Sequence, residues 1–232
     1  SETVSAEIEL DRVPPQNPSV MLDDGMEYTN RKDRLVRLEF DVVDGFQMRV
    51  SNRYDFLGAP WVSFKKRIPK WMLTPRTGDK TVYVQYRDRA GNLSEVASSN
   101  ITLDYIPPTQ VGIDIENGAV YTKNRLVTIK VSAKDATHMT FKGGPGWEDY
   151  KEIYTWELSE GDGEKEINAK FRDSGGNISV VVQDKIILDT KPPTDCIINI
   201  NNQEKYARDP RSLNIELFAS GADEILISNN AN

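Results

Sequence analysis

Cysteine and histidine are nearly absent from this sequence, which has one of each in 232 residues. They stand far apart, at Cys196 and His138, so no internal disulfide can form and neither a nucleophilic triad nor a zinc site can be assembled from the usual ligands. Carboxylates are plentiful, but no pair has a spacing that distinguishes it from an ordinary solvated face. The sequence therefore predicts a protein that is not an enzyme and that requires no cofactor.

Long hydrophobic runs and a consistent excess of one charge are also missing. No apolar run approaches the roughly 18 residues that a membrane span requires, so none is expected in this chain. The net charge is −7, but residues 16–107 carry 14 basic and 12 acidic side chains, whereas residues 108–192 carry 11 and 14. A shared nucleic-acid surface would be basic in both regions, so nucleic acid is not an expected partner.

The most prominent feature present is a repeat. The phrase I-x-L-D-x-x-P-P occurs three times, at Ile8 to Pro15, Ile101 to Pro108 and Ile186 to Pro193. A fixed period of this kind marks a tandem array. We expect the last strand of a preceding domain with its linker at 1–15, two domains at 16–107 and 108–192, and the first half of a further domain at 193–232, which together would be a segment of a longer protein.

Between these phrases, apolar and polar residues alternate, which indicates β-strands with one buried face. No stretch of ten or more residues has convincing helical spacing. In the first domain, strands are expected at about 18–23, 34–43, 46–52, 60–66, 68–74, 79–88 and 94–104. Seven strands predict an all-β fold of tandem immunoglobulin-like β-sandwiches, joined by short Asp-x-x-Pro-Pro linkers.

The alternation also predicts the core. Its positions align without a gap in all three copies, as Val36, Leu38, Phe40 and Val42, then Val127, Ile129, Val131 and Ala133, then Leu213, Ile215, Leu217 and Ala219. Trp71 and Trp156 recur in Trp-x-Leu, and each is predicted to fill space between the sheets, where burial is worth about 4–6 kcal/mol. Cys196 takes the place of Val111, so we expect it to be a small buried residue.

The turn before the last strand is the best specified local motif. Arg87 to Asn92 in one repeat matches Arg172 to Asn177 in the next, and each has an aspartate that can accept turn amides and a glycine that tolerates positive φ. Together with Met-Arg-Val-Ser-Asn at Met48 to Asn52 and the run from Lys80 to Ser94, this pattern resembles bacterial immunoglobulin-like tandem-repeat domains. The resemblance covers essentially the whole chain. It implies an extended, non-catalytic array, as in surface adhesins, stalks of exported enzymes and phage tail or decoration proteins.

Sandwich geometry predicts polar clusters at the domain junctions, because a linker, the second loop and the last hairpin meet at one end of each domain. The residues there are Asp11, Asp44, Asp88 and Asn92 for the first domain, and Asp104, Asp135, Asp173 and Asn177 for the second. Calcium takes six to eight oxygen ligands, so each set is a candidate interdomain calcium site. The resemblance agrees, since some arrays of that family bind calcium near such junctions. The alternative is that each aspartate caps its own turn.

Trp61 and Trp147 recur roughly ten residues before the Trp-x-Leu tryptophans. If exposed, they are candidate ligand contacts that would stack on the rings of host glycans. The alternative is packing at the core or at the sheet edge.

Three functions are compatible with these features: a structural spacer or adhesion segment, a glycan- or protein-binding module, and an accessory region of an exported enzyme. We favour the spacer, within a larger surface protein or a bacteriophage virion protein. The expected partners are neighbouring domains of the same polypeptide and other structural proteins of the assembly. The expected location is extracellular, on the bacterial cell surface, or in a virion.

Overall fold

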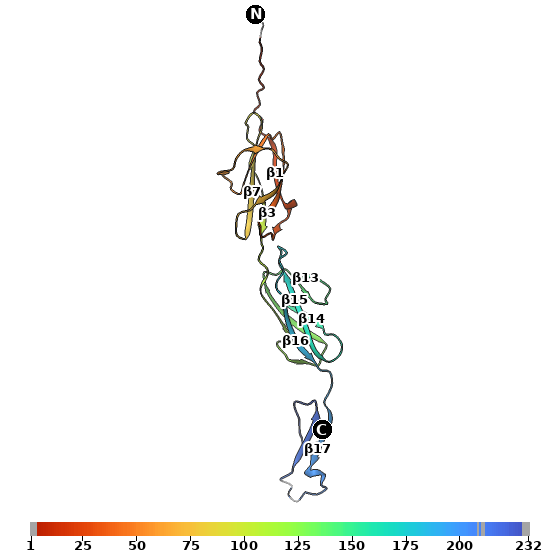
Figure 1. Ribbon diagram of the computed structural model, residues 1–232. Coiled ribbons are helices and arrows are strands. Elements are labelled where there is room, and N and C mark those ends of the chain that lie inside the picture. Colours follow the sequence, from red (N-terminus) through yellow and green to blue (C-terminus); the bar gives the residue numbers. More distant parts are fainter. Residues whose placement is uncertain (1–3, 208, 210–211, 229–232) are drawn as a thin grey trace. The chain divides into compact units, whose positions relative to one another are not determined.

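The computed structural model describes residues 4–207, 209 and 212–228, and its regular structure is almost entirely β (Figure 1). The two helices in this part of the chain are short 3₁₀ turns, η1 (Asp23–Gly25) and η2 (Asn201–Gln203). Neither is long enough to cross a membrane. The sequence-based expectation of a chain built from strands is therefore confirmed.

Strands β1 to β8 form the first sandwich. They are β1 (Gln16–Leu22), β2 (Tyr28–Thr29), β3 (Leu35–Val43), β4 (Gln47–Ser51), β5 (Val62–Ser63), β6 (Arg67–Met72), β7 (Gly78–Arg87) and β8 (Ala97–Leu103). One sheet has the order β1-β3-β6 and the other the order β2-β8-β7-β4-β5. This division into two sheets, with connections such as β3 to β4 and β6 to β7 that cross from one sheet to the other, is the immunoglobulin-like arrangement.

Strands β9 to β16 repeat the same order. They are β9 (Thr109–Ile115), β10 (Tyr121–Thr122), β11 (Leu126–Lys134), β12 (His138–Phe141), β13 (Glu148–Asp149), β14 (Ile153–Glu157), β15 (Gly163–Arg172) and β16 (Val182–Leu188). Their sheets run β14-β11-β9 and β10-β16-β15-β12-β13, strand for strand as in the first sandwich. The chain is therefore built from tandem immunoglobulin-like β-sandwiches.

The last two strands, β17 (Thr194–Ile200) and β18 (Ile215–Ser220), form a two-stranded antiparallel sheet. The Asp-x-x-Pro-Pro segments at 11–15, 104–108 and 189–193 lie between strands and belong to none. By compactness the chain divides into two units. Their boundary passes through β9, β11, β15 and β16, so it crosses the second sandwich. Ser1 and Glu2, at the start of the expected strand in 1–15, lie outside the described residues.

The predicted alternation produces the core of both sandwiches. Val36, Leu38 and Phe40 on β3 are at most 5% exposed, and their counterparts Val127, Ile129 and Val131 on β11 are at most 3% exposed. The facing sheets supply aligned partners, which are Met48, Val50, Val82, Val84 and Tyr86 in the first sandwich and Met139, Phe141, Ile167, Ala169 and Phe171 in the second. In the third copy, Ile215 and Leu217 are 42% and 36% exposed, because no second sheet covers this hairpin among the residues that the structure describes.

A polar contact at the end of each repeat's first strand also recurs. The carboxylate of Asp23 in η1 accepts a hydrogen bond from the Arg37 amide at 2.7 Å. The Glu116 carboxylate accepts from Thr128, and the Asn201 side chain from Asn214. In the first sandwich η1 carries the chain from β1, in one sheet, to β2, which pairs in parallel with β8 of the other sheet. A two-residue strand is too short to produce a visible alternation, so β2 is not among the strands predicted from the sequence.

Two expectations about the core are corrected. Trp71, like Trp156 in the second sandwich, is half-buried. It packs at the rim of the first core, with its indole Nε1–H donating to Asn52 Oδ1 at 2.9 Å. The fully buried side chain in this region is Leu73, at 1% exposure, so Trp71 does not fill the space between the sheets. Cys196 is exposed instead of buried, because in the described part of the chain β17 pairs with β18 alone and no second sheet lies over the pair.

Candidate functional site

The hairpin that follows β7 is held by the carboxylate of Asp88. Asp88 is 3% exposed, and its Oδ1 accepts the amides of Gly91 at 2.7 Å and Asn92 at 2.8 Å. Gly91 has φ of 94°, a conformation that side chains with a Cβ rarely adopt. Asn92 Nδ2 donates to Asp88 Oδ2 at 2.8 Å. The turn is therefore closed on both carboxylate oxygens.

The same asparagine reaches the linker that precedes its sandwich. Asn92 Nδ2 donates to the carbonyl oxygen of Asp11 at 3.2 Å, and in the second sandwich Asn177 Nδ2 donates to the carbonyl oxygen of Asp104 at 2.9 Å. Asn177 also donates to Asp173 Oδ2 at 3.0 Å, as Asn92 does to Asp88. We call this pair of contacts, from one amide to the turn aspartate and to the linker carbonyl, the linker clamp.

Each linker aspartate also caps its own turn. Oδ1 of Asp11, Asp104 and Asp189 accepts the amide of the residue two positions later, at 2.9, 3.0 and 3.1 Å. The turn-capping alternative is thus present in all three linkers. It uses one oxygen of each carboxylate and leaves the other for further contacts.

In the first sandwich the predicted carboxylates do come together. Asp11, Asp44 and Asp88 each place one carboxylate oxygen within 4.8 Å of the other two, and among the described residues they are the one group of three or more potential metal-binding side chains arranged in this way. Asn92 is hydrogen-bonded to two members of the group. The cluster therefore joins the linker, the loop after β3 and the hairpin after β7, as sandwich geometry predicts.

In the second sandwich the corresponding residues are not gathered in the same way. Asp173 and Asn177 form the turn and the clamp, but within the described part of the chain Asp104, Asp135 and Asp173 form no such group, and Asp135 is exposed. The hairpins also differ in sequence, and in particular Gly175 stands where the first has Ala90. A Cβ at Gly175 would lie 3.2 Å from the Asp104 carbonyl oxygen, so the glycine permits the close approach of this linker.

The electrostatics of the turn follow from these bonds. Burial raises the pKa of Asp88, but hydrogen bonds from the Asn92 side chain and from the turn amides lower it by more, so the pKa lies below its ordinary value. The carboxylate is therefore held in its charged form, which is the form that can bind a cation.

The tryptophan Trp61 does not present a bare ring to solvent. It is half-buried, and the guanidinium carbons of Arg49 and Arg87 lie 5.0 and 4.7 Å from its ring centre. In the second sandwich Trp147 is 37% exposed and lies under Arg172 at 4.6 Å. Both tryptophans therefore pack against arginines at the edge of a sheet.

Ser94 and Ser179 have a structural role that was not predicted from the sequence. Ser94 Oγ accepts the amide of Tyr86 at 3.0 Å and donates to the Glu95 carbonyl oxygen at 2.7 Å. Ser179 makes the same two bonds, to Phe171 and Val180, at the same distances. Their identical position, two residues after the asparagine of each hairpin, is the sequence signal that could have identified them.

Comparisons with known proteins give a likeness of fold at a low level. No protein-family model matches the chain, and no curated protein matches it. Among solved structures, the chain is similar to the fibronectin(III)-like modules of Clostridium thermocellum CbhA, with 15% sequence identity and a TM-score of 0.45 over 73% of this chain and 93% of that one. At this level the likeness carries no functional information, and the sheet order described above establishes the sandwich fold.

Proposed function

We propose that this chain is a non-catalytic structural spacer or adhesion segment of a larger protein, located on a bacterial surface or in a bacteriophage virion. Its partners are then neighbouring domains of the same polypeptide and other structural proteins of that assembly. The observation that carries the proposal is the linker clamp. In each sandwich the equivalent asparagine side chain, Asn92 or Asn177, holds the backbone of the linker that precedes it.

A spacer must resist bending at its junctions, and three features of the linkers act in that direction. The prolines limit φ at two successive residues. The aspartate turn bonds restrict the residues before the prolines. The clamp then ties the linker to the hairpin of the following sandwich. All three devices recur while the outer surfaces differ, as expected where stiffness is the shared requirement.

The proposal is tested by the variant Asn177→Ala in the whole chain. It removes the clamp at the linker between the two sandwiches, so we expect the two sandwiches to tumble more independently. The measurement is ¹⁵N relaxation of backbone amides in each sandwich, with small-angle scattering as a second readout of the spread of conformations.

Asn92→Ala is the matched control, because it breaks the same turn bond in the first sandwich and leaves the linker at 104–108 unchanged. If Asn177→Ala left the rotational correlation times as they are in the parent chain, or if Asn92→Ala changed them equally, the clamp would not stiffen the array and the proposal would lose its main support.

We further propose that Asp11, Asp44 and Asp88 together bind a calcium ion. Three carboxylates this close repel one another, and a divalent cation offsets that repulsion while it supplies a bond between linker and sandwich. The ion would add to the clamp at the first junction, where three carboxylates converge.

Calcium binding is tested with the variant Asp44→Asn, since Asp44 is exposed and tolerates the change. We expect the parent chain to release or take up heat on titration with calcium and the first sandwich to melt at a higher temperature. Asp44→Asn should lose both effects, and Asp135→Asn, its counterpart in the second sandwich, should keep them. A parent chain without a calorimetric signal at millimolar calcium would rule out the site.

A further inference from the structure

The outer face of the β4–β7 pair in the first sandwich carries an arrangement that a spacer does not require. Alternation directs Gln47 and Arg49 of β4 outward, together with Tyr83, Gln85 and Arg87 of β7. The register sets Arg49 opposite Gln85 and Gln47 opposite Arg87. With Trp61, which lies just before β5, these five side chains form what we call the arginine–tryptophan face.

Both guanidinium groups of this face are held in place. Arg49 lies over Phe56 at 4.4 Å as well as over Trp61, and it donates from Nε and Nη2 to Gln85 Oε1 at 3.2 and 2.6 Å. Arg87 donates from Nε to Gln47 Oε1 at 2.6 Å. The Gln85 amide is itself fixed, since it donates to the Ser94 carbonyl oxygen at 2.9 Å. A ligand would therefore meet side chains that have already lost most of their rotamer freedom.

The charge of these two arginines is not balanced by a carboxylate. Arg37, Arg53, Arg67 and Arg125 all form ion pairs, but none of the ion pairs in the described part of the chain includes Arg49 or Arg87. Their acceptors are neutral amide oxygens and their ring contacts are neutral, so two positive charges share one tryptophan. An arginine has five N–H donors, and the hydrogen bonds above use two on Arg49 and one on Arg87. The remaining donors suit an oxyanion.

The second sandwich shows which part of this arrangement is common scaffold. Arg172 keeps the stacking on the equivalent tryptophan, Trp147. Thr140 stands in the place of Arg49, however, and Asp149 stands opposite His138, with 3.7 Å between Nε2 and the carboxylate. One arginine on the tryptophan is therefore common to both sandwiches, and the second arginine is present only in the first. The first sandwich also has Ser63 on the edge strand where the second has the Asp149 carboxylate.

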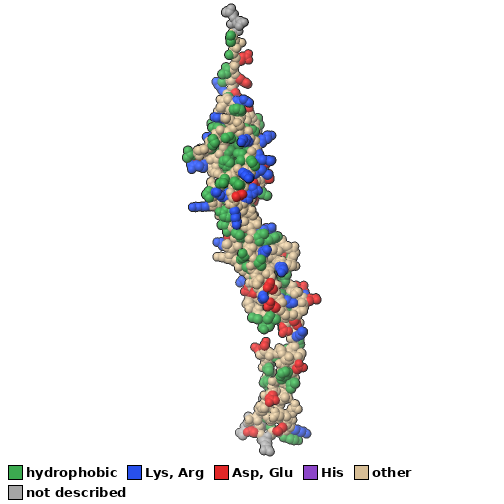
Figure 2. Space-filling model, viewed as in Figure 1, with side chains coloured by type: hydrophobic (Ala, Val, Ile, Leu, Met, Phe, Trp, Pro, Cys, Tyr) green, Lys and Arg blue, Asp and Glu red, His purple; other side chains and the backbone are tan. Residues whose placement is uncertain are grey.

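We propose that the arginine–tryptophan face binds an acidic polysaccharide, with Arg49 and Arg87 contacting its carboxylate or sulfate groups. The face is a sheet surface, which suits an extended polymer lying across strands. Tyr54, 69% exposed and edge-on to Tyr83 at 5.6 Å, continues it with aromatic rings on which sugars can pack. Lys and Arg side chains lie over several parts of the first sandwich in Figure 2, but within the described residues of that sandwich only this face has two of them both stacked and without an acidic partner. This goes beyond the spacer function and does not depend on it.

The experiment uses the whole chain and isothermal titration with an oligogalacturonate, which carries carboxylates, and a sulfated dextran oligomer. Neutral dextran serves as the uncharged comparison. We expect binding to at least one of the acidic polymers and none to dextran. Arg49→Thr, which copies the second sandwich, should weaken the affinity about tenfold, and Arg49→Thr/Arg87→Gln should abolish binding. Whichever of the two acidic polymers binds more tightly identifies the preferred anionic group.

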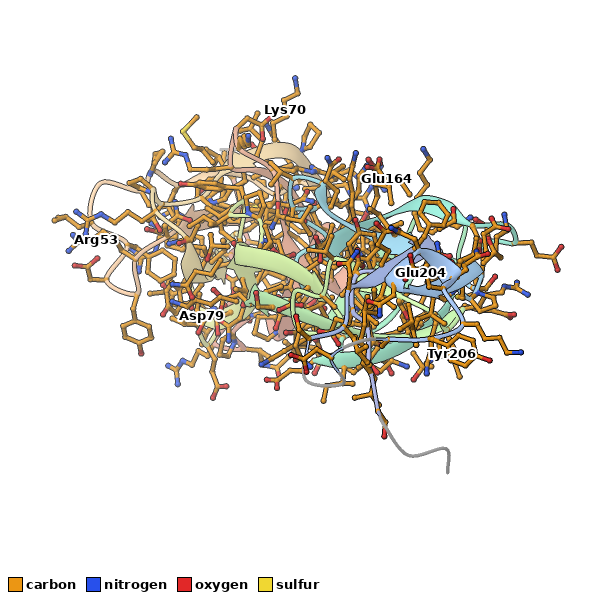
Figure 3. The ribbon with its side chains drawn as sticks, turned by 90° about the horizontal axis from the view of Figure 1, so that it is seen from below. Arg53, Lys70, Asp79, Glu164, Glu204 and Tyr206 are labelled. Atoms are coloured by element: carbon orange, nitrogen blue, oxygen red, sulfur yellow. The ribbon has the colours of Figure 1, made fainter. Side chains whose placement is uncertain are left out.

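Lys70→Gln is the control for loss of one positive charge. Lys70 lies on β6, in the opposite sheet, and points into solvent in Figure 3. It should leave the affinity unchanged. A thermal melt and an NMR spectrum of each variant show whether the first sandwich is folded, and Arg49→Lys, which restores the charge, should recover part of the affinity.

Three outcomes would overturn the proposal. The first is an absence of binding to either acidic polymer by the folded parent chain. The second is an equal loss of affinity in Lys70→Gln. The third is binding of a single-stranded oligonucleotide as tightly as the polysaccharide, which would mean that charge alone is recognised.

Discussion

At the scale of single residues, small polar side chains satisfy backbone groups inside the sandwiches. Ser94 is a clear example, since its hydroxyl accepts the amide of Tyr86 inside the first sandwich. A buried amide that loses its acceptor costs more than an exposed one, because water cannot replace the bond.

We therefore expect Ser94→Ala to lower the free energy of unfolding of the first sandwich by about 1–3 kcal/mol. Ser179→Ala should do the same in the second sandwich, because the two serines make matching bonds at matching distances. Urea denaturation followed at residues of each sandwich measures both changes. A loss below about 0.5 kcal/mol in both variants would show that the amide finds another partner.

The second prediction at this scale concerns acid. Because the pKa of Asp88 is lowered in the folded state, its ionisation stabilises the fold at pH values above about 4, the ordinary pKa of an aspartate. This contribution disappears as the pH falls through the folded-state pKa. The melting temperature of the first sandwich should thus fall between pH 5 and pH 2, and in Asp88→Asn the fall should be shallower. Equal pH dependence in the two proteins would contradict the assignment.

At the scale of elements, the residues of β6 and just after it differ in how deeply they are buried. Leu73, just after this strand, is fully buried, whereas Trp71 lies at the rim with its indole N–H bonded to Asn52. The tryptophan thus couples β6 to the end of β4 by one hydrogen bond and by packing over part of its ring.

Truncation of Trp71 should accordingly cost less than the loss of a fully buried tryptophan. We expect Trp71→Ala to destabilise the first sandwich by about 2–4 kcal/mol and Trp71→Phe by about 1 kcal/mol, since phenylalanine keeps most of the packing and loses the hydrogen bond. Chemical denaturation measures both. If the two variants were equally unstable, the hydrogen bond and not the packing would dominate.

At the scale of the whole molecule, the sheets decide what can unfold together. Each sheet in the described residues draws its strands from one of three stretches, 16–103, 109–188 or 194–220, and no pairing joins one stretch to another. Cooperative unfolding is therefore expected to be confined within a sandwich.

Val84→Asp tests this directly, because it places a charge at a position that is completely buried in the first sandwich. We expect the first sandwich to be unfolded and the second to retain its dispersed NMR resonances. Ala169 is the counterpart of Val84, and Ala169→Asp should have the reverse effect. Loss of both sandwiches in either variant would show that they fold as one unit.

The sequence by itself determined the longer strands, the order of the repeats and the buried positions that alternate along those strands. The reason is that an alternation with a period of two shows which face of a strand is buried. Positions such as Val36 and Val127 can therefore be recognised as buried without knowledge of the fold. Only the tertiary structure decided which polar groups meet. Asp11, Asp44 and Asp88 converge whereas Asp104, Asp135 and Asp173 do not, and Arg49 and Arg87 share Trp61, because these contacts join segments far apart in the chain whose loop paths no local pattern encodes.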